Sequence, residues 1–439
     1  MHGPAYNDTE RGPPTNDENE EIVSIADTAM PAVASEAWER LEPKLLATSR
    51  RVNKLESEPD RRHSLICFKV ERNSPYVEVD GERLLMMSGY SYLGLSGDER
   101  IVAAAKAAVE LYGTGCHGVR LLAGSLPIHR ELEAAVARFA ERPAALVFGS
   151  GYAANAGTIA AICGPGDSVI IDKSDHASIT DGCRLSGATV TRFRHNDPND
   201  LDRRLRLAGG SGVRLVVVDS VYSMDGDIAP LPELRQVCDA HGALLMVDEA
   251  HAVGVIGPAG RGIEDHFGNF DLVDIKMGTL SKGIPSVGGW VAGRRSLVDF
   301  LKYNARPFVF SGALPPAQAA AALEALRILE SEPERVAHVQ SQASRLRAVL
   351  GQAGIAIGRS ETAIIPLIAG SDERAYDFAT SCRHEGIVAL PVVSPAVATG
   401  FARLRVAVTA SHSADHVDIA ASAFVKAARR CRLLADRRG

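Results

Sequence analysis

Four groups of residues could act on a carbonyl compound or bind an anion. In chain order they are the glycine-rich turn Gly149–Asn155, His176, Asp248 with His251, and Lys282. A lysine on a loop of small residues can form a Schiff base. Free N–H groups at a helix N-terminus can bind a phosphate. A carboxylate at a strand end can pair with a cationic ring nitrogen, and a histidine can stack on an aromatic ring.

Each of these features also has an ordinary interpretation. Most lysines are solvated, a lone histidine is usually packed or exposed, and many glycine turns are only tight turns. The letters Asp-Glu-Ala-His also occur in helicases, but the phosphate loop that helicases need is missing from this sequence. The order of the four groups is more specific than any one of them. Phosphate anchor, ring stack, pyridinium partner and Schiff-base lysine together describe a site for pyridoxal 5′-phosphate (PLP).

A second glycine motif, Gly113–Gly118, fits the dinucleotide-binding pattern. That pattern requires a strand before the glycines and a helix opening on them. Here a predicted helix, Ile101–Leu111, precedes the motif. We therefore reject dinucleotide binding and expect these glycines to let the backbone approach another ligand.

The elements that must position the four groups alternate between helix and strand from about residue 98 to residue 310. Short apolar runs predict buried strands, and the polar stretches between them predict helices. The runs are Ala144–Phe148, Ser168–Ile171, Ala188–Phe193, Leu215–Val218, Ala243–Val247 and Leu272–Met277. The alternation predicts an α/β fold with a mainly parallel, doubly wound sheet. The carboxyl ends of such strands form one ligand-binding edge.

The sequence predicts four segments. Residues 1–30 should be a disordered acidic tail, and residues 31–85 an N-terminal helix followed by a hairpin with an Asp-Gly turn. Residues 86–315 should form the large PLP-binding catalytic domain. Residues 316–439, which begin with a long Ala-rich helix, should form a smaller C-terminal α+β domain.

Composition excludes several other classes of protein. The chain has 439 residues, and its net charge of −6 belongs entirely to residues 1–30, so no basic footprint for nucleic acid is visible. Seven scattered cysteines argue against a disulfide framework or a metal site and favour the cytoplasm. The first residues lack the apolar core of a signal peptide. The uncharged stretch Pro143–Gly166 is too rich in glycine for a membrane span.

The chain also resembles the α-oxoamine synthases, a family of fold-type-I PLP-dependent enzymes. This family includes 8-amino-7-oxononanoate synthase, 2-amino-3-ketobutyrate CoA ligase, 5-aminolevulinate synthase and serine palmitoyltransferase. The resemblance covers nearly everything after about residue 75. The matching segments are Tyr92–Leu95, Tyr222–Asp227, Val247–His251, the Lys282 loop, Leu314–Pro316, Arg403–Arg405 and Thr409–His412.

The resemblance implies a role for each matching residue. Lys282 would hold the cofactor and move the substrate proton, and Asp248 would pair with the pyridine nitrogen. His251 would bond the ring hydroxyl oxygen, and His176 would stack on the ring. Further cofactor contacts are implied for Gly151, Tyr152, Ser223, Thr279 and Ser311, the last reaching the phosphate of a partner subunit. Arg405 would bind the carboxylate of the amino-acid substrate.

The chain departs from the family pattern at three places. Ser91 stands where the family usually has asparagine, and Asp219 stands where many members have glutamate. The loop Gly115–Gly124, which contains Arg120, matches no particular subfamily. We therefore name Ser91 and Arg120 as candidate substrate contacts.

The resemblance implies a homodimeric acyltransferase with shared active sites. It would condense a small amino acid with an acyl thioester, carried by coenzyme A or an acyl-carrier protein, and release CO2 to give an α-amino ketone. Two other hypotheses remain open. One is a PLP-dependent aminotransferase or retro-Claisen lyase, and the other is a non-catalytic partner subunit, against which the presence of Lys282 argues.

Overall fold

The computed structural model describes residues 35–57, 61–209 and 211–434. Contacts divide the chain into two compact units, Met1–Ser57 and Glu58–Gly439. The first contains helix α1 (Ser35–Leu55), which confirms the helix predicted there. The predicted acidic tail lies outside the described residues.

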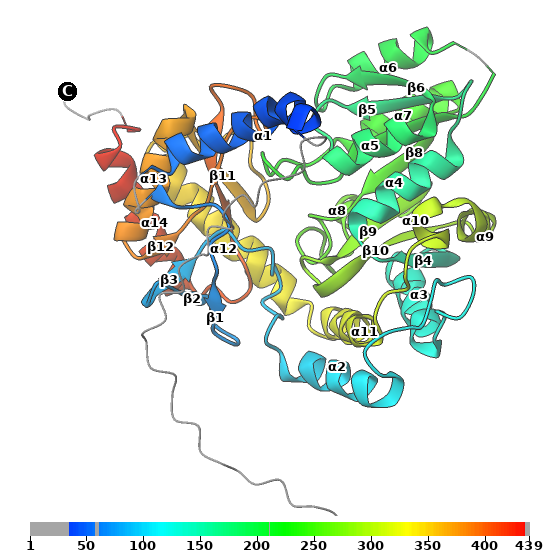
Figure 1. The fold of residues 1–439 in the computed structure, drawn as a ribbon, viewed down its shortest axis with the longest axis horizontal. Coiled ribbons are helices and arrows are strands. Elements are labelled where there is room, and N and C mark those ends of the chain that lie inside the picture. Colours follow the sequence, from blue (N-terminus) through cyan, green and yellow to red (C-terminus); the bar gives the residue numbers. More distant parts are fainter. Residues whose placement is uncertain (1–34, 58–60, 210, 435–439) are drawn as a thin grey trace, which may run out of the picture. The chain divides into compact units, whose positions relative to one another are not determined.

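A seven-stranded sheet forms the centre of the second unit (Figure 1). Its order is β4 (Ala144–Phe148), β10 (Pro285–Gly293), β9 (Ile275–Ser281), β8 (Leu244–Asp248), β7 (Arg214–Asp219), β5 (Ser168–Asp172) and β6 (Thr189–Phe193). The five strands from β9 to β6 are parallel, and β10 runs antiparallel to both of its neighbours. The predicted mainly parallel α/β sheet is confirmed.

Helices cover both faces of this sheet because its strands alternate between two apolar cores. Leu215 and Val217 of β7 pack with α4, α5, α9 and α10, whereas Val216 and Val218 pack with α6 and α7. The helices of this region are α2 (Glu99–Tyr112), α3 (Pro127–Phe139), α4 (Gly151–Ile162), α5 (Ala177–Ser186), α6 (Pro198–Leu207), α7 (Leu231–His241), α8 (Ile263–Phe267), α9 (Arg295–Asn304), α10 (Arg306–Val309) and α11 (Pro316–Ser331). Such two-sided burial explains why the strands read as continuous apolar runs.

The C-terminal part contains a three-stranded sheet in the order β11 (Ile364–Gly370), β14 (Ala402–Ala407) and β13 (Pro391–Val392). Helices α12 (Glu334–Gln352), α13 (Asp372–His384) and α14 (Ala414–Arg430) pack around it. The division into a large and a small domain at residue 315 stays a prediction.

The predicted hairpin is present as β2 (Tyr76–Val79) and β3 (Glu82–Met86). Asp80 and Gly81 both have positive φ, as the turn of a two-residue hairpin requires. The hairpin is extended on one side by β1 (Lys69–Val70) and on the other by β12 (Ile387–Val388), which pairs with β3 in parallel. This pairing joins residues about 300 positions apart, and no local sequence pattern predicts it.

The stretch Pro143–Gly166 forms β4, a turn and helix α4, as predicted. Among the helices that the structure describes, none is long and apolar enough to cross a membrane.

Candidate active site

The side chains of three buried residues meet beside Lys282, which directly follows strand β9. Lys282 Nζ lies 2.8 Å from His251 Nε2, and His251 Nδ1 lies 2.8 Å from Tyr92 Oη. Arg405, from β14, donates from Nη2 to Tyr92 Oη at 3.0 Å and lies 3.4 Å from His251 Nδ1. The group therefore brings together the loop after β8, the segment before α2, and the C-terminal sheet.

This network assigns the protons on His251. Arginine can only donate, so Nδ1 of His251 is the acceptor for both Arg405 and the Tyr92 hydroxyl. The remaining proton of neutral His251 is then on Nε2, and Lys282 Nζ, 2.8 Å away, accepts it when the amine is neutral. Burial lowers the pKa of His251 well below its usual range, and Lys282 and Arg405 lower it further. Burial also lowers the pKa of Lys282 to about 8, although Asp248 and Asp219 oppose that shift.

Asp248 ends strand β8 and is held in one orientation by two donors. Its Oδ1 accepts the Ala250 N–H at 2.8 Å, and its Oδ2 accepts from Asn155 Nδ2 at 2.7 Å. The same amide nitrogen of Asn155 donates to Ser178 Oγ at 2.9 Å, and this oxygen lies 2.7 Å from His176 Nδ1. A chain of hydrogen bonds thus orients both the carboxylate at the sheet edge and the imidazole that caps α5.

An anion-binding end of a helix adjoins these groups. Ser150 caps α4 by accepting the Ala153 N–H, and the preceding Gly149 and the helical Gly151 carry no side chain over this end. A Cβ on Gly151 would lie 3.1 Å from Thr279 Oγ1 and 3.2 Å from Met277 Cε. A side chain at this position would therefore crowd Thr279 and Met277, and glycine avoids that contact. Thr279 Oγ1 in turn lies 2.8 Å from Ser281 Oγ. Backbone N–H groups and hydroxyls of this kind suit a phosphate.

Most of these residues line one cavity of about 260 Å³, whereas Tyr92 and Arg405 lie outside its lining, behind His251. It contains Gly151, Tyr152, His176, Asp248, His251, Thr279 and Lys282 from the predicted set, together with Ser150, Asn155, Ser178 and Asp219. Parallel strands end at the same edge of a sheet, so residues that are distant in the sequence converge there.

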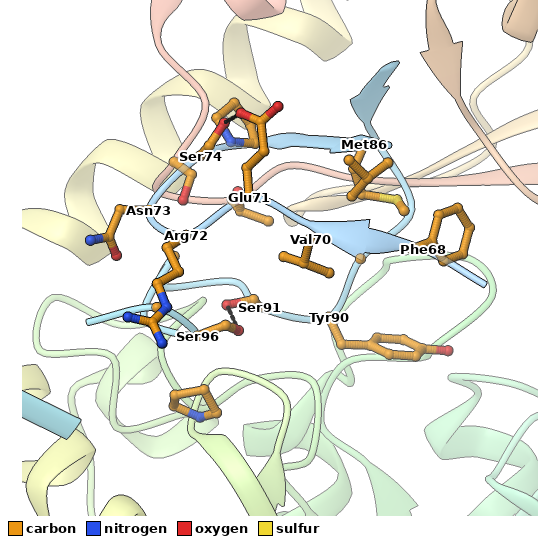
Figure 2. A pocket seen from close by; sticks show the side chains of 18 of the residues that line it. Phe68, Val70, Glu71, Arg72, Asn73, Ser74, Met86, Tyr90, Ser91 and Ser96 are labelled. Atoms are coloured by element: carbon orange, nitrogen blue, oxygen red, sulfur yellow. Dashed lines mark hydrogen bonds between the residues drawn. The ribbon is translucent and has the colours of Figure 1, made fainter. Parts of the chain in front are cut away.

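A second, larger pocket of about 540 Å³ shares Ser281 and Lys282 with the first. Figure 2 shows Phe68, Met86 and Tyr90 toward one end of it and Arg72, Asn73 and Ser74 toward the other. The pocket therefore leads from the reactive amine along an apolar stretch to a polar end.

The other predicted residues occupy varied positions. Ser91 lines the larger pocket and bonds Ser96. Ser223 contributes its main-chain oxygen, which accepts from Arg405 Nε at 2.7 Å. Ser311 is exposed and lines neither cavity.

Arg120 also lies outside both cavities. It pairs with Glu133 at 2.9 Å and donates from Nε to Ser125 Oγ. The structure gives no support to its predicted substrate contact.

Sequence reasoning missed three residues of the site. Tyr92 begins a segment that carried the family resemblance but no assigned role, and Tyr90 lies next to Ser91, where the chain departs from the family pattern. The ring of Tyr90 lies 4.8 Å from Arg405 Cζ and 5.7 Å from Lys282 Nζ. Asn155 could have been found, because a buried amide inside an otherwise apolar helix must have a partner.

Behind the site, a half-buried histidine joins two carboxylates. His195 Nδ1 lies 3.0 Å from Asp172 Oδ1, and its Nε2 lies 2.8 Å from Asp227 Oδ2. Burial alone would lower the pKa of His195, but the hydrogen bonds to both carboxylates raise it to about 9. The histidine is therefore a cation that ties the segment after β6 to the turn containing Ser223.

This cation predicts a pH-dependent stability. The pKa in the folded state lies above the unfolded value of about 6.5, so the contribution is complete below pH 6.5 and is lost as the pH rises through about 9. We expect His195→Gln to lower the free energy of unfolding by about 2–3 kcal/mol at pH 6 and by much less at pH 9.5, as measured by urea denaturation. An equal loss at both pH values would contradict the charged assignment.

Comparisons with known proteins agree with this geometry. The family model for aminotransferase class I and II matches residues 82–424. The chain is 42% identical to 8-amino-7-oxononanoate synthase of Symbiobacterium thermophilum, covering 81% of this chain and 91% of that protein. It is 40% identical to serine palmitoyltransferase of Sphingobacterium spiritivorum, with coverage of 80% and 88%. The solved serine palmitoyltransferase of S. paucimobilis with bound PLP-myriocin aldimine has a TM-score of 0.86 and 32% identity, covering 90% of this chain and 99% of that one.

Proposed function

Because the chain belongs to the α-oxoamine synthase family of fold-type-I PLP-dependent enzymes, we propose that it joins a small amino acid to an aliphatic acyl group. The reaction class is that of the family, a decarboxylative condensation of an amino acid with an acyl thioester. The choice of small amino acid and aliphatic acyl chain is our proposal. One observation carries it: Arg405, which has an unpaired buried nitrogen, contacts His251, and the other ring nitrogen of His251 bonds Lys282, which lines the larger pocket.

The residues present fit PLP. Asp248 offers a fixed carboxylate for a ring nitrogen, the start of α4 with Thr279 and Ser281 suits the phosphate, and about half of Lys282 is a neutral amine at pH 8. Bound PLP supplies an electron sink for the Cα of the amino acid. We propose that Lys282 removes the α-proton, since burial brings its pKa close to the working pH. His176 would contact one face of the ring.

Arg405 is the proposed carboxylate site. The residue is only 4% exposed, and its Nη1 has no hydrogen-bond partner, whereas Nε and Nη2 hold the group in place. A buried guanidinium nitrogen left unpaired costs free energy unless a ligand satisfies it. A carboxylate is the ligand whose geometry matches. Holding the substrate there would orient its Cα toward Lys282.

The larger pocket is the proposed acyl site. Phe68, Val70 and Met86 would cover an aliphatic chain, and Ser91 would lie near the amino acid. Arg72 is exposed at the polar end and has no ion pair with the residues that the structure describes. A phosphate of coenzyme A or of a carrier-protein arm would suit it.

Absorbance titration of the PLP-loaded enzyme tests these assignments. A panel of amino acids is added first, and acyl thioesters of increasing chain length follow. We expect small amino acids to perturb the cofactor spectrum, and an aliphatic thioester then to release free thiol. Dependence on a 2-oxo acid instead of a thioester would show an aminotransferase. A chain that takes up no PLP and responds to no amino acid would be a non-catalytic subunit.

The pH dependence of PLP uptake provides a further prediction. Only the neutral amine of Lys282 can attack an aldehyde, and its pKa is about 8. The uptake rate of the cofactor-free enzyme should therefore rise about tenfold per pH unit below pH 8 and level off above it. Stopped-flow absorbance measures this rate. A midpoint near 10 would mean that Lys282 is not desolvated.

We also propose a homodimer in the cytoplasm. Seven free thiols suit a reducing compartment. Leu122, Phe310 and Tyr152 are 84%, 70% and 49% exposed, and Ser311, the predicted contact to a partner's phosphate, follows Phe310. A second copy of the chain would bury these apolar groups. Phe310→Asp should shift the sedimentation coefficient toward that of a monomer, and an unchanged value would refute this interface.

A further inference from the structure

A second carboxylic acid lies beside Asp248 in the smaller cavity. Asp219 ends strand β7, and its Cα is the register partner of Asp248 at the end of β8. Both residues line the cavity that contains Lys282. Asp219 is 3% exposed, so its carboxyl group is shielded from bulk water.

The two carboxyl groups have very different hydrogen-bond partners. Asp248 accepts an N–H on each oxygen, from Ala250 and Asn155. Asp219 receives the backbone N–H of His176, while its Oδ1 is buried without a partner. Hydrogen bonds from N–H groups favour the ionised form of a carboxyl group. Of the two carboxyl groups, that of Asp248 is therefore the one more readily ionised.

The charges around Asp219 point the same way. Asp248 on β8 and Asp172 at the end of β5 are acidic neighbours, and Lys282 after β9 is, when protonated, the cation that opposes them. Burial and Asp219 also raise the pKa of Asp175, after β5, well above its usual range. Asp175 lies directly behind, because its two carboxylate oxygens accept the backbone N–H groups of Asp219 and Asp172. Burial and the charge of Asp248 raise the pKa of Asp219 well above its usual range. Adjacent buried carboxyl groups commonly retain one proton between them in this way.

The strand order gives the position of Asp219 relative to the other groups of the site. The phosphate-binding start of α4 follows β4, and Lys282 follows β9, whereas Asp219 lies on β7, beyond Asp248. In PLP the phosphate arm and the phenolic oxygen flank the aldehyde carbon on opposite sides. A ring with its aldehyde carbon at Lys282, its nitrogen at Asp248 and its phosphate arm toward α4 would have its phenolic oxygen on the side away from α4, where Asp219 lines the cavity.

We propose that Asp219 is a further cofactor-contacting residue, whose Oδ1 carries a proton and donates it in a hydrogen bond to the phenolic oxygen of PLP. Asp219 would act beside His251, which the family resemblance assigns to the same oxygen. This inference depends on PLP binding and not on which amino acid or thioester the enzyme uses.

A pH titration of the absorbance of the resting, PLP-loaded enzyme without substrates tests the proposal. A neutral donor stabilises the phenolic oxygen most strongly after the imine nitrogen linking Lys282 to PLP has lost its proton. Asp219→Ala should therefore raise the titration midpoint by about one pH unit, the tenfold change that one hydrogen bond supplies. Asp219→Asn keeps a neutral donor and should leave the midpoint within about 0.3 units.

An ionised Asp219 would shift the titration midpoint of the variants in the opposite direction. It would stabilise the protonated imine, so both Asp219→Ala and Asp219→Asn would lower the midpoint, and that result would overturn the proposal. Midpoints unchanged in both variants would also overturn it, since Asp219 would then not contact the cofactor. If the alanine variant does not fold, Asp219→Val takes its place, because it also removes the donor; an unchanged midpoint in that variant would overturn the proposal, and a raised one would support it.

The dissociation constant of PLP supplies a readout that is independent of the chromophore's titration. Equilibrium dialysis should show binding about three- to tenfold weaker for Asp219→Ala than for Asp219→Asn. Asp239→Ala is the matched control, because its side chain is 67% exposed and pairs with Arg235 away from the cavity. It should change neither quantity.

Discussion

Replacing Lys282 with alanine is expected to lower kcat by a factor of at least about 10⁴. The variant loses the only amine in the cavity among the described residues, and with it both the covalent link to PLP and the base for the α-proton. Neither His251 nor Arg405 can substitute. His251 is held as a neutral donor by its partners, and Arg405 stays protonated. Thiol release from the acyl thioester measures the rate.

Lys302→Ala is the matched control for that experiment. Lys302 is a surface lysine that pairs with Asp299 three residues away, so its loss should leave kcat within a factor of about two. Lys282→Ala should still fold, because Nζ contributes a single hydrogen bond to the network. Retention of more than a few per cent of activity by this variant would remove Lys282 from the chemical step.

Replacing Arg405 with alanine is expected to raise KM for the amino acid about 100-fold, which corresponds to losing one partner of a buried charged pair. Lowered kcat should accompany this change, because the substrate also loses the contact that orients its Cα. Arg405→Lys keeps the charge but not the planar fork of the guanidinium. Its KM for the amino acid should therefore lie between the values of the unmodified enzyme and of Arg405→Ala. Steady-state kinetics with the amino acid varied at saturating thioester separates KM from kcat.

Tyr92→Phe controls for indirect effects of that substitution. Arg405 also bonds Tyr92 and the main chain of Ser223, so alanine could disturb the site as well as the substrate. Tyr92→Phe removes the shared hydrogen bond and leaves the guanidinium. Its KM should rise by less than about tenfold. Equal effects of the two substitutions would indicate that Arg405 acts by supporting Tyr92 and His251.

The sequence predicted six of the seven strands of the central sheet, all but β10, because buried strands are continuous apolar runs. β4 was predicted with its correct ends, and β5, β7 and β8 within one residue. Residues at the ends of parallel strands must share an edge, so Asp248 and Lys282 could be expected to meet. Strand β9 was predicted three residues too early at its start, since apolar residues before it continue the same pattern without joining the sheet.

Contacts between distant segments could not be predicted in this way. The pairing of β12 with β3, and the approach of Arg405 to Tyr92, depend on how the C-terminal part folds onto the rest of residues 58–439. Local periodicity carries no such information. The family resemblance named Arg405, but only the structure shows that its Nη1 is left without a partner. For Arg120 the structure argues against the predicted substrate contact, because the charge of this residue is already neutralised by Glu133.

The central claim, that this chain joins an amino acid to an acyl thioester with loss of CO2, is tested most directly by the stoichiometry of one reaction. The amino acid that perturbs the cofactor spectrum is supplied with ¹³C at its carboxyl carbon, together with an aliphatic acyl thioester. We expect one labelled CO2 and one free thiol for each α-amino ketone formed. Formation of a 2-oxo acid that retains the label, with no thiol released, would contradict the claim.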